Sequence, residues 1–252
     1  YTYINNKTTP IVFIHGVGLD RNMWTPQINF FRKYSTLTYD LLGHGKTPFN
    51  EDKIIIEDYT HQLISLIEDL KISKLHLVGF SIGSLIAMDF AANFNNKLSS
   101  LTLIATTYKR NQKQRQEVID RVNLAKSNKP ISKLALKRWF TDEYLEKNPK
   151  IYEEFMRILT KEPEEQKNFI KAYELFAHYK DDIKKIKKIN TRTLVMTGSI
   201  DPGSTPEMSK NLSSDLKNSQ YIEINKGKHL CSIECSDDVN INIEKFIIND
   251  PN

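Results

Sequence analysis

Short apolar runs bounded by polar or turn-forming residues recur along the chain. Each run is four or five residues long, which is typical of strands, and most lack the apolar–polar alternation of a half-exposed strand. The pattern therefore predicts strands that are buried on both faces, as in a parallel sheet. The runs occupy residues 11–14, 36–39, 75–78, 101–105, 193–196 and 221–224.

Between several of these runs, apolar residues recur with helical spacing. One such segment precedes the third run and includes Leu63, Ile67 and Leu70, and another follows that run and includes Leu85 and Phe90. Alternating strands and helices predict an α/β fold, with a mostly parallel central sheet flanked by helices.

The alternation stops between residues 108 and 188, where apolar residues keep helical spacing and no strand is apparent. Pro130, Pro149 and Pro163 divide this segment into several predicted helices. We therefore expect one core domain, residues 1–107 and 189–252, with a helical cap, 108–188, inserted into it. A cap entering from one strand and returning to another is suited to cover the carboxyl ends of the strands, where open α/β sheets bind ligands.

Charge is distributed unevenly along the 252 residues, although the net charge is only +5. Residues 109–188 contain 21 Lys and Arg against 13 Asp and Glu, so the predicted cap is the basic part of the chain. Acidic residues interrupt the basic ones throughout, which favours a solvated helical surface and argues against a nucleic-acid partner. An anionic small molecule is the alternative that the charge leaves open.

The cellular compartment is predicted from targeting and membrane signals that the sequence does not show. No apolar run approaches the roughly 18 to 20 residues of a membrane span, and residues 1–10 show no secretory signal, although the sequence does not begin with Met. The two cysteines, Cys231 and Cys235, do not suggest a disulfide scaffold. We therefore expect a cytoplasmic protein without a membrane partner, and a monomer or homodimer.

The strongest local motif is Gly79-Phe80-Ser81-Ile82-Gly83, which lies between a predicted strand and a predicted helix. A serine in this sharp turn adopts strained backbone angles, and glycines two positions before and after it remove side chains that would crowd the turn. The hydroxyl is then presented at the end of the sheet. Ser81 is accordingly the candidate nucleophile.

A serine hydroxyl needs a neighbouring base, and in this arrangement an acid and then a histidine follow it along the chain. Asp201 comes directly after the strand predicted at 193–196, whereas the loop after the preceding strand contains no acid. His229 lies in the turn after the last predicted strand. We predict that Asp201 orients the imidazole and that His229 is the general base.

Backbone amides are predicted to bind the oxyanion that forms at the reacting carbonyl. Ile82 follows the nucleophile and supplies one N–H by position. The loop His15-Gly16-Val17-Gly18 follows the first strand, and Val17 is the candidate for the second N–H. His15 is expected to fix this loop by hydrogen bonding rather than to catalyse. His44 is expected to shape a loop, and His61 and His76 to be structural.

No metal and no cofactor are predicted. His, Cys, Asp and Glu do not occur with the spacing of a metal site, and neither a Walker motif nor Gly-x-Gly-x-x-Gly is present.

With these motifs, residues 10–248 resemble the α/β-hydrolase superfamily, and most closely its 3-oxoadipate enol-lactonase and carboxylesterase group. The resemblance also involves residues 23–27, Arg138-Trp139-Phe140-Thr141, Asp201-Pro202 and His229-Leu230. It implies hydrolysis of a small anionic enol-lactone through an acyl-enzyme. Two positions depart from the lactonase pattern: His15-Gly16 stands where Asn-Ser is expected, and Leu42 where an arginine is usual.

Arg138 and Trp139 are the candidate substrate-binding residues, since an arginine could pair with a substrate carboxylate and a tryptophan could line the pocket. A surface arginine beside a buried tryptophan is the alternative. We expect a serine hydrolase of the carboxylic ester class, acting on a small ester or lactone. Hydrolysis of a carbon–carbon bond in a ring-cleavage product uses the same triad, and a non-catalytic ligand-binding member of the fold is the remaining alternative.

Overall fold

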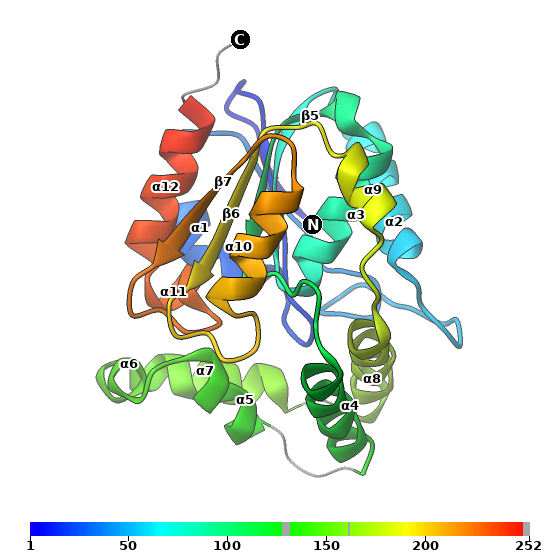
Figure 1. Cartoon of the computed structure of the whole chain (residues 1–252), viewed down its shortest axis with the longest axis vertical. Helices are drawn as coiled ribbons and strands as arrows, with labels where there is room; N and C mark the ends of the chain where they lie inside the picture. The colour runs from blue at the N-terminus through cyan, green and yellow to red at the C-terminus, as the bar shows by residue number, and fades with distance from the viewer. Residues whose placement is uncertain (128–131, 161, 249–252) are drawn as a thin grey trace.

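A seven-stranded sheet forms the centre of the molecule (Figure 1). The computed structural model describes residues 1–127, 132–160 and 162–248. The strand order is β1-β3-β2-β4-β5-β6-β7, and every pairing is parallel except that of β1 with β3. The predicted fold class, a mostly parallel sheet flanked by helices, is confirmed. The strands are β1 (Thr2–Ile4), β2 (Ile11–Ile14), β3 (Thr36–Thr38), β4 (Leu75–Phe80), β5 (Leu98–Ile104), β6 (Thr193–Gly198) and β7 (Ser219–Ile224).

Each of the six predicted apolar runs forms a strand, and β2, β3, β4 and β6 are buried along their whole length. β1 was not predicted, because it is a three-residue edge strand with mostly exposed side chains. The opposite edge, β7, is also largely exposed or half-buried. Burial on both faces is thus a property of the central strands, which explains why their sequences lack alternation.

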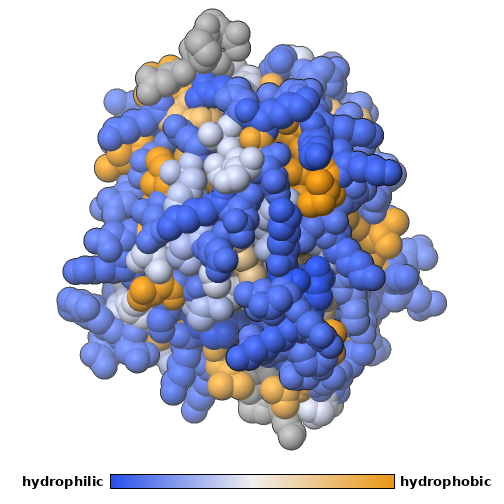
Figure 2. Space-filling model, in the orientation of Figure 1, coloured by the Kyte–Doolittle hydropathy of each residue, from blue (hydrophilic) through white to orange (hydrophobic). Residues whose placement is uncertain are grey.

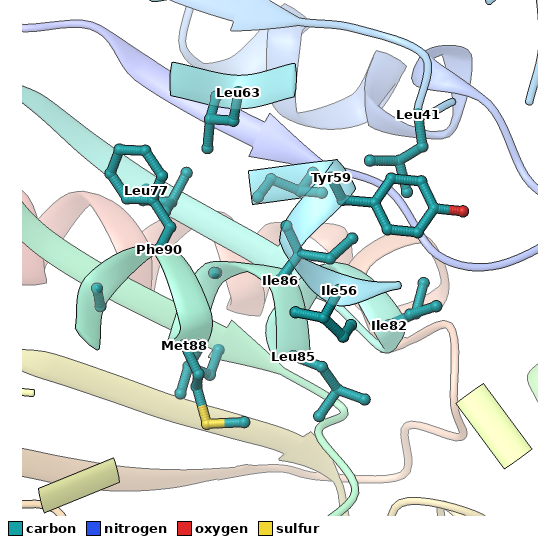
Figure 3. Close-up of a cluster of buried hydrophobic side chains, with 14 of the residues drawn as sticks. Leu41, Ile56, Tyr59, Leu63, Leu77, Ile82, Leu85, Ile86, Met88 and Phe90 are labelled. Carbon is teal, nitrogen blue, oxygen red and sulfur yellow. The ribbon is translucent and has the colours of Figure 1, made fainter. Parts of the chain in front are cut away.

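Two apolar clusters cover the two faces of the sheet. Alternate residues of β2 divide between them: Val12 and Ile14 belong to one cluster, and Ile11 and Phe13 to the other. The first cluster, part of which Figure 3 shows, joins the sheet to α2 (Ile56–Asp69), α3 (Ile82–Asn93), α9 (Ile183–Lys188) and α10 (Pro206–Asp215). The second cluster joins it to η1 (Arg21–Trp24), α1 (Thr25–Phe30), α11 (Cys231–Glu234) and α12 (Ser236–Ile248).

A group of helices lies across the end of the sheet toward which the parallel strands point (Figure 1). We refer to α4 to α8 as the overlying helices. Pro149 and Pro163 each begin one of them, at the position where a missing N–H costs no helical hydrogen bond. Pro130 lies outside the described residues. The overlying helices are α4 (Gln112–Lys126), α5 (Ser132–Trp139), α6 (Asp142–Lys147), α7 (Pro149–Leu159) and α8 (Pro163–His178).

The basic segment does not lie wholly over the end of the sheet. Its last helix, α9, packs against α3 on the flank of the sheet. The division into a core and a cap that begins at 108 and ends at 188 stays a prediction. The remaining short helix, η2 (Asn95–Lys97), follows α3.

The surface in Figure 2 is mainly hydrophilic, with hydrophobic residues in small separate groups. Among the described residues, no helix combines the length and the apolar composition that a membrane span requires.

Candidate active site

Ser81 occupies a strained turn between β4 and α3. Its backbone φ is +55°, a conformation that costs energy for any residue with a side chain. A Cβ atom on Gly79 would come within 2.3 Å of the Gly83 carbonyl oxygen, and one on Gly83 within 2.4 Å of the Ile14 carbonyl oxygen. Glycine is therefore required on both sides of the serine, because only then can the helix start so close to the strand.

The structure brings Ser81, Asp201 and His229 together at the carboxyl ends of the strands. The Nε2 atom of His229 lies 3.3 Å from the Ser81 Oγ, and its Nδ1 atom lies 2.7 Å from an Asp201 carboxylate oxygen. The Asp201 side chain is fully buried, whereas the His229 side chain retains 14% exposure. The acid is thus shielded from water while the histidine still faces the pocket.

Hydrogen bonding at Asp201 determines the tautomer of His229. The second carboxylate oxygen of Asp201 accepts from the backbone N–H groups of Gly203, at 2.8 Å, and Ser204, at 3.0 Å. A carboxylate held in this way is an acceptor, so the proton of a neutral His229 lies on Nδ1. The Nε2 lone pair is then directed at the Ser81 hydroxyl, which is the arrangement needed to withdraw its proton.

The loop after β2 is held by His15. The Leu41 N–H donates to Nε2 of this histidine at 2.9 Å, so its Nδ1 carries the proton and donates to the Gly16 carbonyl oxygen at 2.8 Å. His15 is fully buried and thus fixes the loop, as expected. Val17 lines the pocket beside Ser81. Ile82 is the first residue of α3, a position whose N–H has no partner within the helix.

One pocket contains Ser81 and His229 and extends under the overlying helices. Its empty space of roughly 740 Å³ includes open solvent. Both predicted substrate-binding residues, Arg138 and Trp139, contribute to its lining. Trp139 is 8% exposed and packs against Phe155. Much of the remaining lining is apolar and comes from Leu19, Phe80, Val118, Ala135, Leu159, Phe169 and Phe176.

The polar pocket residues that were missed from the sequence include Arg121 on α4 and Tyr173 on α8. The Nε of Arg121 donates to the Tyr173 hydroxyl at 3.1 Å. A signal for Arg121 exists, because it occupies the buried stripe of its helix, three residues after Val118 and four before Ala125. An arginine inside an apolar stripe is unusual and could have been noticed.

The loop carrying His229 is fastened to the segment that joins α5 to α6. The Leu230 N–H donates to the Trp139 carbonyl oxygen at 3.0 Å. Glu234 accepts from the Lys228 N–H at 3.1 Å, from the Thr141 N–H at 2.9 Å and from the Thr141 hydroxyl. We refer to this set as the Glu234 clamp. It ties the position of His229 to that of the overlying helices.

The remaining histidines and the cysteines lie outside this constellation. His44 interacts with the Leu42 carbonyl oxygen within its loop, and His76 with the Ser100 hydroxyl on the neighbouring strand. Cys231 and Cys235 are not bridged; burial raises the pKa of the Cys235 thiol to about 11. Within the described ranges, no three His, Cys, Asp or Glu side chains are grouped so as to hold a metal ion.

Known proteins are similar to this chain over most of its length. The (E)-2-((N-methylformamido)methylene)succinate hydrolase of Acinetobacter baylyi is 29% identical over 247 residues, which cover 96% of this chain and 91% of the relative. The 3-oxoadipate enol-lactonase 2 of the same organism is 25% identical over 89% of this chain and 83% of its own. Among solved structures, the enol-lactonase from Burkholderia xenovorans LB400 superposes with a TM-score of 0.87, at 23% identity, over 96% of this chain and 92% of that one.

The sequence also matches a family model. The model describes the α/β-hydrolase fold and matches residues 9–234, which span all strands from β2 to β7 and every overlying helix. The resemblance inferred from the motifs is thus confirmed at the level of the family and of its enol-lactonase relatives. This chain belongs to the α/β-hydrolase family.

Proposed function

We propose that the protein is a serine hydrolase that cleaves a small carboxylic ester or lactone through an acyl-enzyme. The observation that carries the proposal is the alignment of Ser81, His229 and Asp201 at hydrogen-bonding distances in one pocket. The names of the two curated relatives, an enol-lactonase and a hydrolase of a succinate derivative, support a small-molecule substrate.

In the proposed reaction, His229 Nε2 takes the proton of Ser81 while the serine oxygen attacks the substrate carbonyl carbon. The resulting oxyanion accepts hydrogen bonds from the N–H groups of Val17 and Ile82, each contributing about 3 to 4 kcal/mol to stabilisation of the transition state. The intermediate collapses, the bond to the leaving oxygen breaks, and His229 returns the proton to that oxygen.

The second half of the reaction uses the same groups. His229 removes a proton from water, the hydroxide oxygen attacks the acyl carbon, and Ser81 leaves as the protonated hydroxyl. Throughout, Asp201 holds the proton on Nδ1 and stabilises the imidazolium, so no cofactor is required in this scheme. The overlying helices are proposed to act as the cap that covers the reacting groups and binds the rest of the substrate.

Labelling by a fluorophosphonate tests whether the serine is activated. The wild-type protein should be labelled, Ser81→Ala should not, and Ser65→Ala, which alters an exposed serine of α2, should be labelled normally. Absence of labelling in the wild-type protein would reject the proposal in favour of a ligand-binding role.

Turnover separates the reactions that the triad could catalyse. The value of kcat/KM for 3-oxoadipate enol-lactone is compared with those for a neutral p-nitrophenyl ester and a vinylogous diketone, with Ser81→Ala as the blank. Hydrolysis of either oxygen ester supports the proposal. Hydrolysis of the diketone alone would replace it with carbon–carbon bond cleavage.

A further inference from the structure

The outer wall of the pocket contains two arginines, Arg121 on α4 and Arg138 on α5. Neither forms an ion pair with an acidic side chain in the described part of the chain. Their common neighbour is the phenol of Tyr173, which accepts a hydrogen bond from the Arg121 Nε and also interacts with the Arg138 side chain. Burial and the charge of Arg121 both lower the pKa of Arg138.

One phenol oxygen cannot satisfy two guanidinium groups, which together have ten N–H donors. The only acid lining the described pocket is Asp201, and its two carboxylate oxygens are already bound by His229 and two backbone amides. The pocket therefore holds an excess of positive charge in a largely apolar surrounding. Such an excess is unfavourable unless an anion from outside the chain compensates it.

Arg110 is an arginine with a structural role, and it serves as a comparison for Arg121 and Arg138. Its Nη2 donates to the carbonyl oxygens of Phe176, at 2.7 Å, and Tyr179, at 3.2 Å, and it joins the end of α8 to the start of α4. It does not line the pocket of Ser81. Arg121 and Arg138, in contrast, make no comparable bonds to backbone carbonyls in the described structure and lie at the wall of the pocket.

We propose that the substrate carries two carboxylate groups, of which Arg121 binds one and Arg138 the other. A guanidinium recognises a carboxylate by two parallel hydrogen bonds, so two arginines match a dicarboxylate with one residue for each group. Tyr173 lies between them as a positioning residue. The inference rests on the proposed function, since the bond to be cleaved must also reach Ser81.

The same arginines could instead hold a single carboxylate between them. The two arrangements differ in the affinity expected for a second acid group. With two separate sites, adding a carboxylate to the other end of a short chain strengthens binding; with one shared site, the second carboxylate gains no partner and is left in an apolar pocket.

Calorimetric titration of the Ser81→Ala variant measures this difference without requiring turnover. The probes are succinate and glutarate, each compared with the monocarboxylate of equal length, butyrate or pentanoate. We expect a dicarboxylate to bind about 10- to 100-fold more tightly than its partner. Equal affinities within a pair would overturn the proposal.

Substitutions assign the effect to the two arginines. In the same Ser81→Ala background, Arg121→Gln and Arg138→Gln should each weaken dicarboxylate binding to about the level of the monocarboxylate. The control substitutions Lys113→Gln and Lys133→Gln remove the same charge from exposed positions of α4 and α5 and should leave binding unchanged. An equal loss in the lysine variants would show a general charge effect and overturn the proposal.

Two further controls distinguish loss of folding from loss of function. Arg121→Lys and Arg138→Lys keep the charge and should retain part of the affinity, and thermal unfolding shows whether each variant is folded. Dicarboxylate binding without fluorophosphonate labelling of the wild-type protein would refute the proposed function but not the ligand class. Labelling without a preference for dicarboxylates would refute only the ligand class.

Discussion

The pocket has two walls that are built differently. On the sheet side, Asp201 and His15 are bound by backbone amides and Ser81 is held by a turn that admits only glycine at its two flanks. On the side of the overlying helices, Arg121 and Arg138 meet the phenol of Tyr173 and apolar side chains. These polar groups of the first wall have hydrogen-bond partners within the chain. The guanidinium groups of the second wall, in contrast, retain N–H donors that the described residues leave unused. We infer that the first fixes the chemistry and the second selects the substrate.

The largest effect is expected from the sheet side, by replacing Asp201 with asparagine. The amide N–H₂ would favour the His229 tautomer whose proton lies on Nε2, which cannot accept the Ser81 proton. We predict a fall in kcat of about 10⁴-fold with the fold preserved. The measurement is steady-state hydrolysis of a p-nitrophenyl ester beside the far-ultraviolet circular dichroism spectrum. A kcat within tenfold of wild type would argue that Asp201 does not orient the histidine.

The turn that carries Ser81 should be the next most sensitive feature. In Gly83→Ala the new methyl group would overlap the carbonyl oxygens of Ile14 and His15, which are backbone atoms that cannot turn aside. We expect the free energy of unfolding to fall by about 3 kcal/mol, measured by urea denaturation. The matched control is Gly203→Ala, whose nearest neighbour would lie at 3.6 Å, and it should change stability by about 0.5 kcal/mol or less. Equal effects would show that the turn is not tightly packed.

The Glu234 clamp connects the two walls, so its removal tests whether they depend on each other. Glu234→Ala leaves the Thr141 hydroxyl, the Thr141 N–H and the Lys228 N–H without their acceptor. We predict a loss of stability of about 1 to 3 kcal/mol and a fall in kcat of about tenfold as His229 becomes less well positioned.

Glu244→Ala provides the control for this clamp. It removes a half-buried carboxylate on α12 that accepts from the Tyr34 hydroxyl, and neither residue lines the pocket. It should lower stability slightly and leave kcat unchanged. If both variants lost stability but neither lost activity, the clamp would be structural only.

The smallest effect is expected at the cysteines. Because burial raises the pKa of Cys235 to about 11, only about one thiol in a thousand or fewer is ionised near pH 7, and the thiolate is the reactive form. Cys231 is fully buried, and burial raises its pKa well above the ordinary value. Iodoacetamide should therefore leave ester hydrolysis unchanged at pH 7 and react faster only as the pH rises toward 11. Rapid inactivation at pH 7 would contradict this assignment.

The two walls also differ in how far they could be predicted from sequence. Ser81, Asp201 and His229 each follow a parallel strand within a few residues, so the strand pattern, together with the motif around Ser81, indicated that they meet at one end of the sheet. Their catalytic roles stay predictions until they are measured. Local sequence was sufficient here because the carboxyl ends of parallel strands must lie side by side.

The outer wall was only partly predicted because its geometry depends on packing between helices. Arg138 and Trp139 were identified, but Arg121 and Tyr173 lie some 50 residues apart, on α4 and α8, and meet only because those helices pack together. Neither lies in a local motif, and Arg121 is difficult to single out in a segment that is rich in lysine. The three-residue strand β1 was missed for a related reason, since its pairing with β3 determines its structure more than its own short sequence does.

The Glu234 clamp limits how this protein could be recombined with its relatives. If the overlying helices were exchanged for those of another hydrolase at junctions near residues 108 and 188, the incoming chain would lack a partner for Glu234 unless it supplied a hydroxyl and an N–H in place of Thr141. A chimera would then receive a new specificity together with a displaced histidine. Transferring residues 137–141 and 228–234 together should keep the donors at residue 141 matched to the acceptor at residue 234. The two walls can then be exchanged as one unit.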